Sequence, residues 1–184
     1  MRSVYVFCAD GFEEVEGLTA VDLLRRAGVS VTMVSIMGRT KITGARNISV
    51  NTDILIEDIK EEADMLVLPG GMPGTKYLAG SKPLTDLLTD FYNKGKKIAA
   101  ICAAPSVFSG LGFLKGRKAT SYPSFMEVIA GDGAVTSEDS VVVDGNVTTS
   151  RGLGTAVDFA LSLITQLENQ EKAEEIAESV VYRH

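Results

Sequence analysis

The sequence predicts an α/β fold in which a mostly parallel β-sheet lies between layers of helices. Short β-branched runs alternate with segments that repeat apolar residues at helical spacing, which is typical of parallel strands joined by crossover helices. Two runs, 64–68 and 97–101, are almost entirely apolar after their first residue, as strands covered on both faces must be. These two runs should form the centre of the sheet.

The remaining elements follow from the same two periodicities and from residues that begin or end helices. Pro105 suits a first helical turn, and Gly95 stands where a helix would stop. No repeat or low-complexity tract is visible, and we expect one domain spanning 1–184. In chain order we expect strands at 4–8, 29–36, 64–68, 97–101 and 141–143, further strands through Val50 and Ile54, a turn at 144–146, and helices at 13–27, 83–92, 105–110, 155–167 and beyond 168.

Composition argues against several classes of partner. The 184 residues include 18 basic and 24 acidic side chains, a net charge of −6, and no basic run is long enough to follow a nucleic-acid backbone. No apolar stretch is long enough to cross a bilayer, and residues 1–8 lack the features of a signal peptide. Two cysteines give no sign of a disulfide framework. We therefore expect a cytoplasmic protein with no nucleic-acid or membrane partner.

Cys102 directly follows the central strand 97–101 and is the candidate nucleophile. Ligands of open parallel sheets bind beyond the carboxyl ends of the strands, where this residue should lie. With small residues and Pro105 after it, Cys102 would stand at a helix N-terminus, whose N–H groups and dipole favour thiolate and can hold an oxyanion. The alternative is a small buried residue at a strand end, which is the role we expect for Cys8.

A glycine-rich segment, Pro-Gly-Gly-Met-Pro-Gly at 69–74, follows the other central strand. Gly70 and Gly71 should therefore lie at the same sheet edge, where a backbone without Cβ can approach a ligand closely. The N–H of Gly71 could complete an oxyanion hole with that of Ala103. The segment matches no phosphate-binding loop, so no nucleotide cofactor is expected. The alternative for this segment is a plain turn.

A carboxyl group interrupts the apolar face of the predicted first helix. If Glu16 points into a protected site, burial would keep it protonated, and it could donate a hydrogen bond to a thiolate or move a proton. Glu13 and Glu14 compete for this role, but in a first helical turn carboxylates often do no more than complement the dipole, and we expect that of both. The stripe consists of Phe12, Glu16, Ala20, Leu23 and Ala27.

Four motifs, in this order, resemble those of the ThiJ/PfpI superfamily, in the branch of the Parkinsonism-associated deglycase and bacterial YajL. They are Gly-Phe-Glu-Glu-Val-Glu at 11–16, Leu-Pro-Gly-Gly at 68–71, Ala-Ala-Ile-Cys-Ala-Ala-Pro at 99–105 and Thr-Ser-Arg-Gly-Leu-Gly-Thr at 149–155. The likeness covers almost the whole chain. It implies a flavodoxin-like three-layer sandwich with a nucleophile elbow.

The resemblance also implies roles for single residues. Cys102 would be the elbow nucleophile and Glu16 its acid partner, while Gly71 and Ala103 would supply oxyanion N–H groups. Members of the family are usually homodimers in which the first helix contributes to the interface. Arg26 and Arg46 match basic residues found near the pocket in this branch.

One departure from the family pattern concerns histidine. Many relatives place one twenty residues after the cysteine, where this chain has Tyr122. The only histidine, His184, is the final residue and is poorly placed to be a base, so we expect no Cys-His-acid triad. Ala103 follows the cysteine directly, and no downstream His-x-Glu is present, so neither peptidase nor glutaminase activity is expected. Tyr122 either donates a hydrogen bond to substrate or walls the pocket.

We expect a cysteine-dependent stress-response enzyme that acts on small reactive aldehydes. The Cys102 thiolate would attack a 2-oxoaldehyde such as methylglyoxal, Glu16 would move a proton between its two carbons, and water would release a hydroxy acid. No metal or other cofactor is expected, because clustered ligands are missing. The alternative is a redox sensor or chaperone in which Cys102 becomes a sulfinate held by Glu16. A thiazole-biosynthesis role follows only from the name of many relatives.

Overall fold

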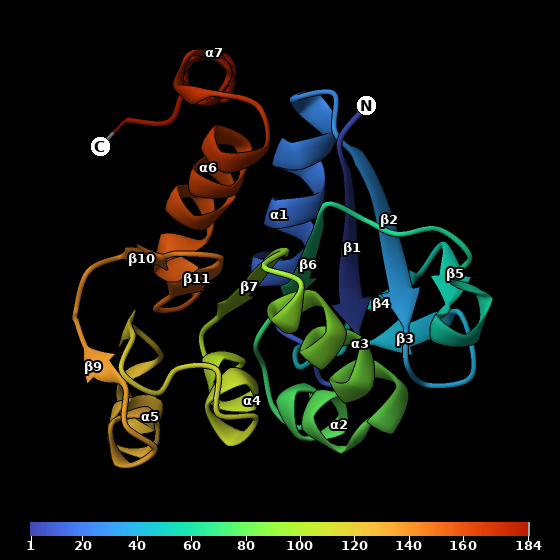
Figure 1. Cartoon of the computed structure of the whole chain (residues 1–184). Helices are drawn as coiled ribbons and strands as arrows, with labels where there is room; N and C mark the ends of the chain where they lie inside the picture. Colours follow the sequence, from blue (N-terminus) through green and yellow to red (C-terminus); the bar gives the residue numbers. More distant parts are fainter. Residues whose placement is uncertain (184) are drawn as a thin grey trace.

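A seven-stranded sheet runs through the chain, in a computed structural model that describes residues 1–183 (Figure 1). Its order is β10-β11-β7-β6-β1-β2-β5, and every neighbouring pair is parallel except β10 with β11. The strands are β1 (Ser3–Cys8), β2 (Ser30–Ser35), β5 (Ile54–Leu55), β6 (Met65–Leu68), β7 (Lys97–Ile101), β10 (Val141–Asp144) and β11 (Val147–Ser150). The two apolar runs predicted to be central, β6 and β7, are neighbours in the interior of the sheet.

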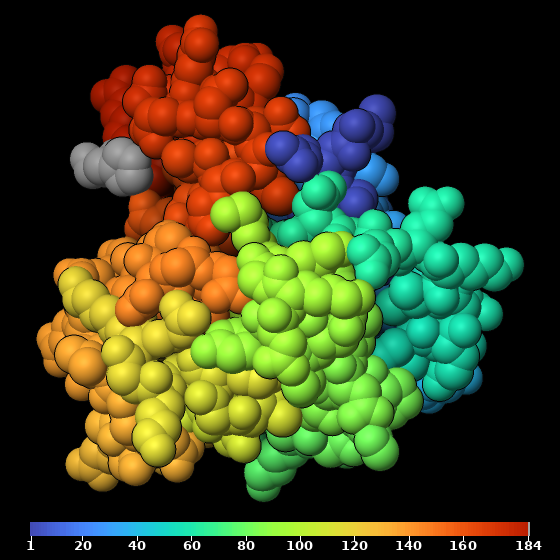
Figure 2. All heavy atoms as spheres, viewed as in Figure 1, coloured from blue at the N-terminus to red at the C-terminus, as the bar shows by residue number. Residues whose placement is uncertain are grey.

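Helices cover both faces of this sheet, which confirms the predicted three-layer sandwich. One face carries α1 (Glu14–Arg26), α6 (Ala156–Leu167) and α7 (Gln170–Ser179), and the other carries α2 (Gly74–Gly80), α3 (Lys82–Asn93), α4 (Pro105–Gly110) and α5 (Met126–Gly131). In the space-filling view α6 and α7, in red, form one end of the molecule, away from α3 and α4 in green and yellow (Figure 2).

Alternation along the central strands gives each helical layer its own core. On β1, Val4 and Val6 are buried against α1 and α6, whereas Phe7 is buried on the opposite face with α3 and α4. The α1 stripe predicted from spacing faces the core: Phe12 and Leu23 are buried, and so is Glu16. Burial of these apolar side chains, each favourable by about 1.5–3 kcal/mol, fixes how α1 lies on the sheet.

Several short elements have no counterpart in the sequence analysis. The strand expected through Val50 is found at β4 (Ser49–Asn51), but its antiparallel partner β3 (Lys41–Thr43) was not predicted, and neither was the pair of β8 (Lys118–Ala119) with β9 (Val135–Thr136). The helices α2 and α5 were also missed, and so was β11 after the predicted turn at 144–146. Single turns of 3-10 helix lie at 56–58, 123–125 and 153–155. These pieces are short, and tertiary contacts rather than local periodicity stabilise them.

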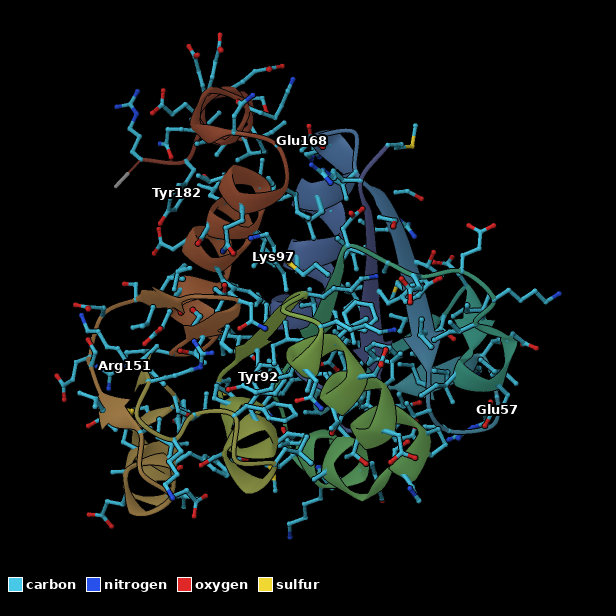
Figure 3. All side chains as sticks on the ribbon, viewed as in Figure 1. Glu57, Tyr92, Lys97, Arg151, Glu168 and Tyr182 are labelled. Atoms are coloured by element: carbon cyan, nitrogen blue, oxygen red, sulfur yellow. The ribbon has the colours of Figure 1, made fainter. Side chains whose placement is uncertain are left out.

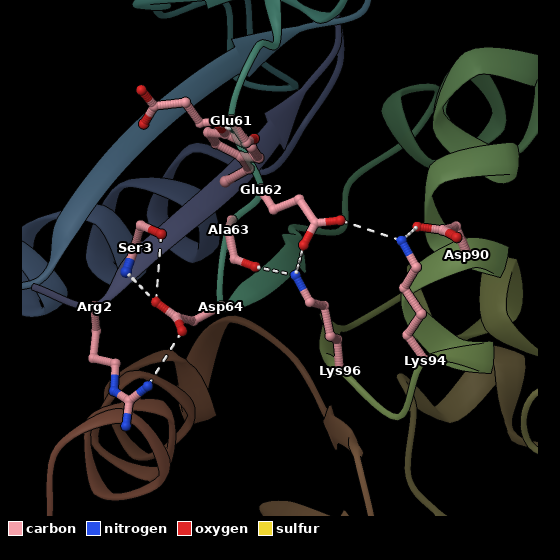
Figure 4. A network of polar contacts seen from close by, with 10 residues as sticks. Arg2, Ser3, Glu61, Glu62, Ala63, Asp64, Asp90, Lys94 and Lys96 are labelled. Atoms are coloured by element: carbon pink, nitrogen blue, oxygen red, sulfur yellow. Dashed lines mark hydrogen bonds and ion pairs between the residues drawn. The ribbon is translucent and has the colours of Figure 1, made fainter.

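An ion-pair network joins the amino ends of the central strands, at the edge opposite Cys102 (Figure 4). Asp64 accepts a hydrogen bond from Arg2 at 3.3 Å, and Glu62 bridges Lys94 at 3.2 Å and Lys96 at 2.6 Å. Exposed pairs of this kind are each worth about 0–1 kcal/mol, so the network contributes modestly to stability.

The chain beyond α7 folds back onto α6. The Tyr182 hydroxyl donates a hydrogen bond of 2.7 Å to Asp158, and Figure 3 shows Tyr182 beside this helix. None of the helices within residues 1–183 is both long and apolar enough to cross a bilayer. His184, which was not expected to be a catalytic base, lies outside the described residues.

Candidate active site

Cys102 forms a strained elbow between β7 and α4. Its φ of +65° lies in the left-handed region, which costs a non-glycine residue about 1–2 kcal/mol. Neighbouring segments hold it there: its N–H donates to the Ser150 carbonyl at 3.0 Å, while its own carbonyl accepts from the Tyr122 N–H at 2.8 Å and the Ser121 hydroxyl at 2.6 Å. Strain maintained in this way presents the thiol at the carboxyl edge of the sheet.

Glu16 lies beside the Cys102 sulfur and is 1% exposed. The thiol and the Glu16 carboxyl group share a hydrogen bond, and Oε2 of Glu16 accepts a second one from the Gly70 N–H at 3.0 Å. A Cβ on Gly70 would lie 2.6 Å from Cβ of Cys102 and 2.7 Å from Oε2 of Glu16. Glycine is therefore required at position 70 for the acid and the thiol to meet.

Burial raises the pKa values of both groups. Burial is the main cause for Glu16, whose pKa is raised to about 7. Hydrogen bonds from Cys102 and Gly70 lower this pKa, and the charge of Glu13 raises it. The pKa of the Cys102 thiol is raised by burial first and then by Glu16. The direction of this shift is opposite to the lowering expected from a helix N-terminus. Burial and the neighbouring Glu16 raise the pKa of the thiol more than the N–H groups of Ala103 and Gly71 lower it. The helix that follows, α4, is also short, with six residues.

Two backbone donors face the sulfur, as the glycine-rich segment predicted. The N–H groups of Gly71 and Ala103 both donate toward Cys102 and lower its pKa. Gly71 has a φ of +91°, and a Cβ there would lie 2.3 Å from the Glu13 nitrogen. Only glycine allows segment 69–74 to pack this closely against the turn that precedes α1. The same close packing brings the Gly71 N–H to the sulfur.

A cavity of about 410 Å³ opens above the thiol and gathers most of the predicted site residues. Cys102, Glu16, Gly71, Ala103, Tyr122 and Arg46 line it, with Gly70 just beneath. The other lining residues are Glu13, which was expected only to complement the helix dipole, and five that no sequence pattern indicated: Ala45, Met72, Ser124, Phe125 and Leu153.

Tyr122 forms part of the cavity wall. The residue is 48% exposed, and a Cβ on Gly152 would touch its ring at 3.4 Å, so the ring edge packs against that glycine. Its hydroxyl makes no hydrogen bond with any residue in the described part of the chain. The ring thus forms part of the wall, and donation from the hydroxyl to a substrate stays a prediction.

The two other acids of the first helical turn do more than complement the dipole. Glu14 is buried, and its Oε1 accepts hydrogen bonds from the N–H groups of Arg46 at 2.8 Å and Ile48 at 3.3 Å. Glu13 is 8% exposed, lines the cavity and lies 4.0 Å from the Arg46 guanidinium. The expectation for this pair is corrected: Glu14 holds the β3–β4 turn against the cavity, and Glu13 forms part of its wall.

Two arginines named in the sequence analysis do not line this cavity. Arg26 is in the last turn of α1, ten residues beyond Glu16 and so about 15 Å along the helix, where it pairs with Asp22 at 2.9 Å. It borders a separate hollow of about 700 Å³, so its expected place near the pocket was wrong. Arg151, in the last family motif, lies beside β9 (Figure 3), and its Nη1 donates to the Glu138 carbonyl at 3.3 Å.

No set of three His, Cys, Asp or Glu side chains among residues 1–183 is grouped as a metal site would require. The site therefore consists of a thiol, a buried carboxyl group and two backbone donors at the carboxyl edge of a parallel sheet. These features define the class of α/β proteins with a nucleophile elbow.

The chain belongs to the DJ-1/PfpI family, which it matches over residues 2–166, and the resemblance seen in the sequence is thereby confirmed. It is 37% identical to the protein dj-1beta of Drosophila melanogaster over 181 residues, covering 98% of this chain and 97% of that one. It is 38% identical to the DJ-1 homolog A of Arabidopsis thaliana over 99% of its length, but spans only 47% of that protein.

Two further comparisons bear on chemistry. A protein of Pyrococcus abyssi named a deglycase is 34% identical over 149 residues, which cover 80% of this chain and 89% of that one. The solved structure of oxidised Toxoplasma gondii DJ-1 is 38% identical, has a TM-score of 0.95 and matches over 100% of both chains.

Proposed function

We propose that the protein is a cysteine-dependent enzyme that converts small 2-oxoaldehydes to hydroxy acids, as a glyoxalase or deglycase that needs neither metal nor glutathione. The observation that carries this proposal is the hydrogen bond between the Cys102 thiol and the buried Glu16 carboxyl group, with the N–H groups of Gly71 and Ala103 on the sulfur. The similarity to a protein named a deglycase supports the reaction class.

The first step forms a carbon–sulfur bond. Because the thiol pKa is raised, Cys102 begins as a thiol, and its proton passes to the Glu16 carboxylate while the sulfur attacks the aldehyde carbon. The carbonyl electrons move to oxygen, where the N–H groups of Gly71 and Ala103 stabilise the charge. Glu16 then returns the proton to that oxygen, and a hemithioacetal results.

The second step moves hydrogen between the two carbons. The Glu16 carboxylate removes the hydrogen of the former aldehyde carbon as a proton, which gives an enediol, and protonation of the neighbouring carbon gives a thioester of the hydroxy acid. One carbon is oxidised and the other is reduced within one molecule, so no external electron acceptor is needed. Water then cleaves the thioester and restores the thiol. A pKa near 7 suits Glu16 to both proton transfers.

A redox role is the second candidate. Hydrogen peroxide would oxidise the Cys102 sulfur to a sulfinate while two peroxide molecules are reduced to water, and protonated Glu16 would donate a hydrogen bond to the product. The similarity to a DJ-1 solved in an oxidised form favours this reading. Under either role we propose, from the family resemblance, a cytoplasmic homodimer with α1 at its interface.

The test is lactate formation from methylglyoxal by the purified protein in metal-free, glutathione-free buffer, beside Cys102→Ala. Cys8→Ala is the matched control, because Cys8 is buried in β1 with its sulfur against the Val6 carbonyl. We expect lactate from the parent and from Cys8→Ala but none from Cys102→Ala. Absence of lactate from all three, with peroxide converting Cys102 to a sulfinate, would replace the enzyme by the redox role.

A further inference from the structure

The cavity above Cys102 has a polar floor and an apolar mouth. Its floor consists of the thiol, Glu16 and the two backbone donors, whereas Met72, Tyr122 and Leu153 stand at the mouth. These three side chains are 41%, 48% and 52% exposed, which is unusual for large apolar groups around one opening. The arrangement suits a ligand with a polar head and an apolar tail.

The size of the cavity exceeds what a three-carbon aldehyde needs. Its volume of about 410 Å³ falls within the range of roughly 300–1,000 Å³ typical of sites that bury drug-sized ligands. Methylglyoxal held at the sulfur would leave the side chains at the mouth in contact with water. A larger substituent would bury them and gain the corresponding hydrophobic free energy.

Tyr122 is fixed relative to the nucleophile. Its N–H donates to the Cys102 carbonyl at 2.8 Å, its ring edge packs on Gly152, and Pro123 restricts its backbone. An aromatic surface held in this way loses little conformational entropy when a ligand packs against it. The ring can therefore discriminate between a flat apolar substituent and a methyl group.

Charge at the mouth disfavours an anionic substituent. The Arg46 guanidinium lies 4.0 Å from the Glu13 carboxylate, which offsets its positive charge, and Glu16 lies below. An added carboxylate or phosphate would meet two acids and one already paired arginine. An uncharged tail is therefore favoured over a charged one.

We propose that this site prefers 2-oxoaldehydes bearing a flat apolar substituent, of the arylglyoxal class, and that Tyr122 is the residue that confers the preference. This inference rests on the proposed function, since it assigns the substrate class of the same thiol. The probe is phenylglyoxal, compared with methylglyoxal by initial rates of hydroxy-acid formation, with the intact protein mass checked for arginine adducts.

We expect kcat/KM for phenylglyoxal to exceed that for methylglyoxal at least tenfold in the parent. Tyr122→Ala should lower this ratio at least fivefold, and Tyr122→Phe should keep it, because the hydroxyl makes no hydrogen bond within the described residues. Tyr77→Ala is the matched control, because Tyr77 is 45% exposed on α2 and does not line this cavity. A parent ratio near one, or a ratio that Tyr122→Ala leaves unchanged, would overturn the proposal.

A second measurement separates failure of this inference from failure of the proposed function. Mandelate and lactate, the two hydroxy-acid products, are compared as protectors of Cys102 against iodoacetamide in the parent protein. We expect half-protection by mandelate at a concentration at least fivefold lower than by lactate, whether or not either aldehyde is turned over. Equal protection by mandelate and lactate would overturn the apolar preference. Stronger protection by mandelate, without turnover of either aldehyde, would contradict only the proposed enzymatic function.

Discussion

Replacing Glu16 by glutamine should stabilise the protein at neutral pH, although it removes the proposed proton carrier. Glutamine keeps the shape of the side chain and an oxygen that can accept from the Gly70 N–H. Burial raises the pKa of Glu16 from 4.5 to about 7, so the folded protein holds a proton that the unfolded chain gives up more readily. The native carboxyl group therefore imposes a pH-dependent cost that glutamine lacks.

The sign and size of this cost follow from the two pKa values. Below pH 4.5 the carboxyl group is protonated in both states and no cost arises. Between pH 4.5 and 7 the unfolded chain loses the proton first, so stability falls as pH rises, and above pH 7 the deficit is constant. A pKa difference of about 2.5 at 1.36 kcal/mol per pH unit gives about 3 kcal/mol. The thiol of Cys102, whose pKa is raised, stays protonated through this window.

The assay is urea unfolding of parent and Glu16→Gln at about pH 5 and pH 8. We expect the stability of the variant relative to the parent to rise by about 1–3 kcal/mol between these values. Glu62→Gln is the control: hydrogen bonds from Lys96 and Lys94 lower the pKa of this exposed carboxyl group, so its relative stability should not rise over the same interval. A relative stability of Glu16→Gln that is equal at both values, or falls, would refute the reasoning.

Three further predictions concern the same site. Gly70→Ala should cut lactate formation at least a hundredfold, because its Cβ would separate Glu16 from Cys102. Gly80→Ala is the control and should retain lactate formation, because its Cβ would meet nothing within 4 Å. Equal rates for the two variants would contradict the contact between Glu16 and Cys102. In the parent, kcat/KM should rise with pH through a midpoint near 7, since Glu16 must be ionised to accept the thiol proton, and a flat profile between pH 5.5 and 8.5 would count against that role. Glu14→Ala should lower the free energy of unfolding by about 1–3 kcal/mol, because two backbone N–H groups lose the buried carboxyl group that accepts from them. Denaturant melts that match those of the exposed-site control Glu57→Ala would show that Glu14 does not hold the turn.

The parts of the fold that the sequence predicted are those with a strong local signal. The strand at 97–101 is found at β7, and the helices at 83–92 and 155–167 are found at α3 and α6. The pair β8 and β9 carries no such signal, because its two strands meet only through hydrogen bonds between distant segments, such as Val135 N–H to the Arg117 carbonyl at 2.8 Å. Local periodicity cannot reveal strands of two residues.

The candidate site divides in the same way. Cys102 and Glu16 were identifiable because each breaks a local pattern, one ending an apolar strand and the other interrupting an apolar stripe. Ala45 joins the cavity because its N–H donates to the Phe12 carbonyl at 2.8 Å, a contact across 33 residues that no local pattern encodes. Arg26 was misplaced because it was assigned by resemblance alone, whereas its position on α1 already separates it from Glu16 by almost three turns.

The central claim is that Cys102 and Glu16 act as one unit, with the carboxyl group moving the protons while the sulfur holds the substrate. The most direct measurement is the rate of lactate formation from methylglyoxal by Glu16→Gln, with iodoacetamide labelling of Cys102 followed in the same samples. We predict a loss of turnover of about 10²–10⁴-fold with Cys102 still open to labelling, in line with the usual contribution of a positioned acid–base group. Turnover within threefold of the parent would contradict the account.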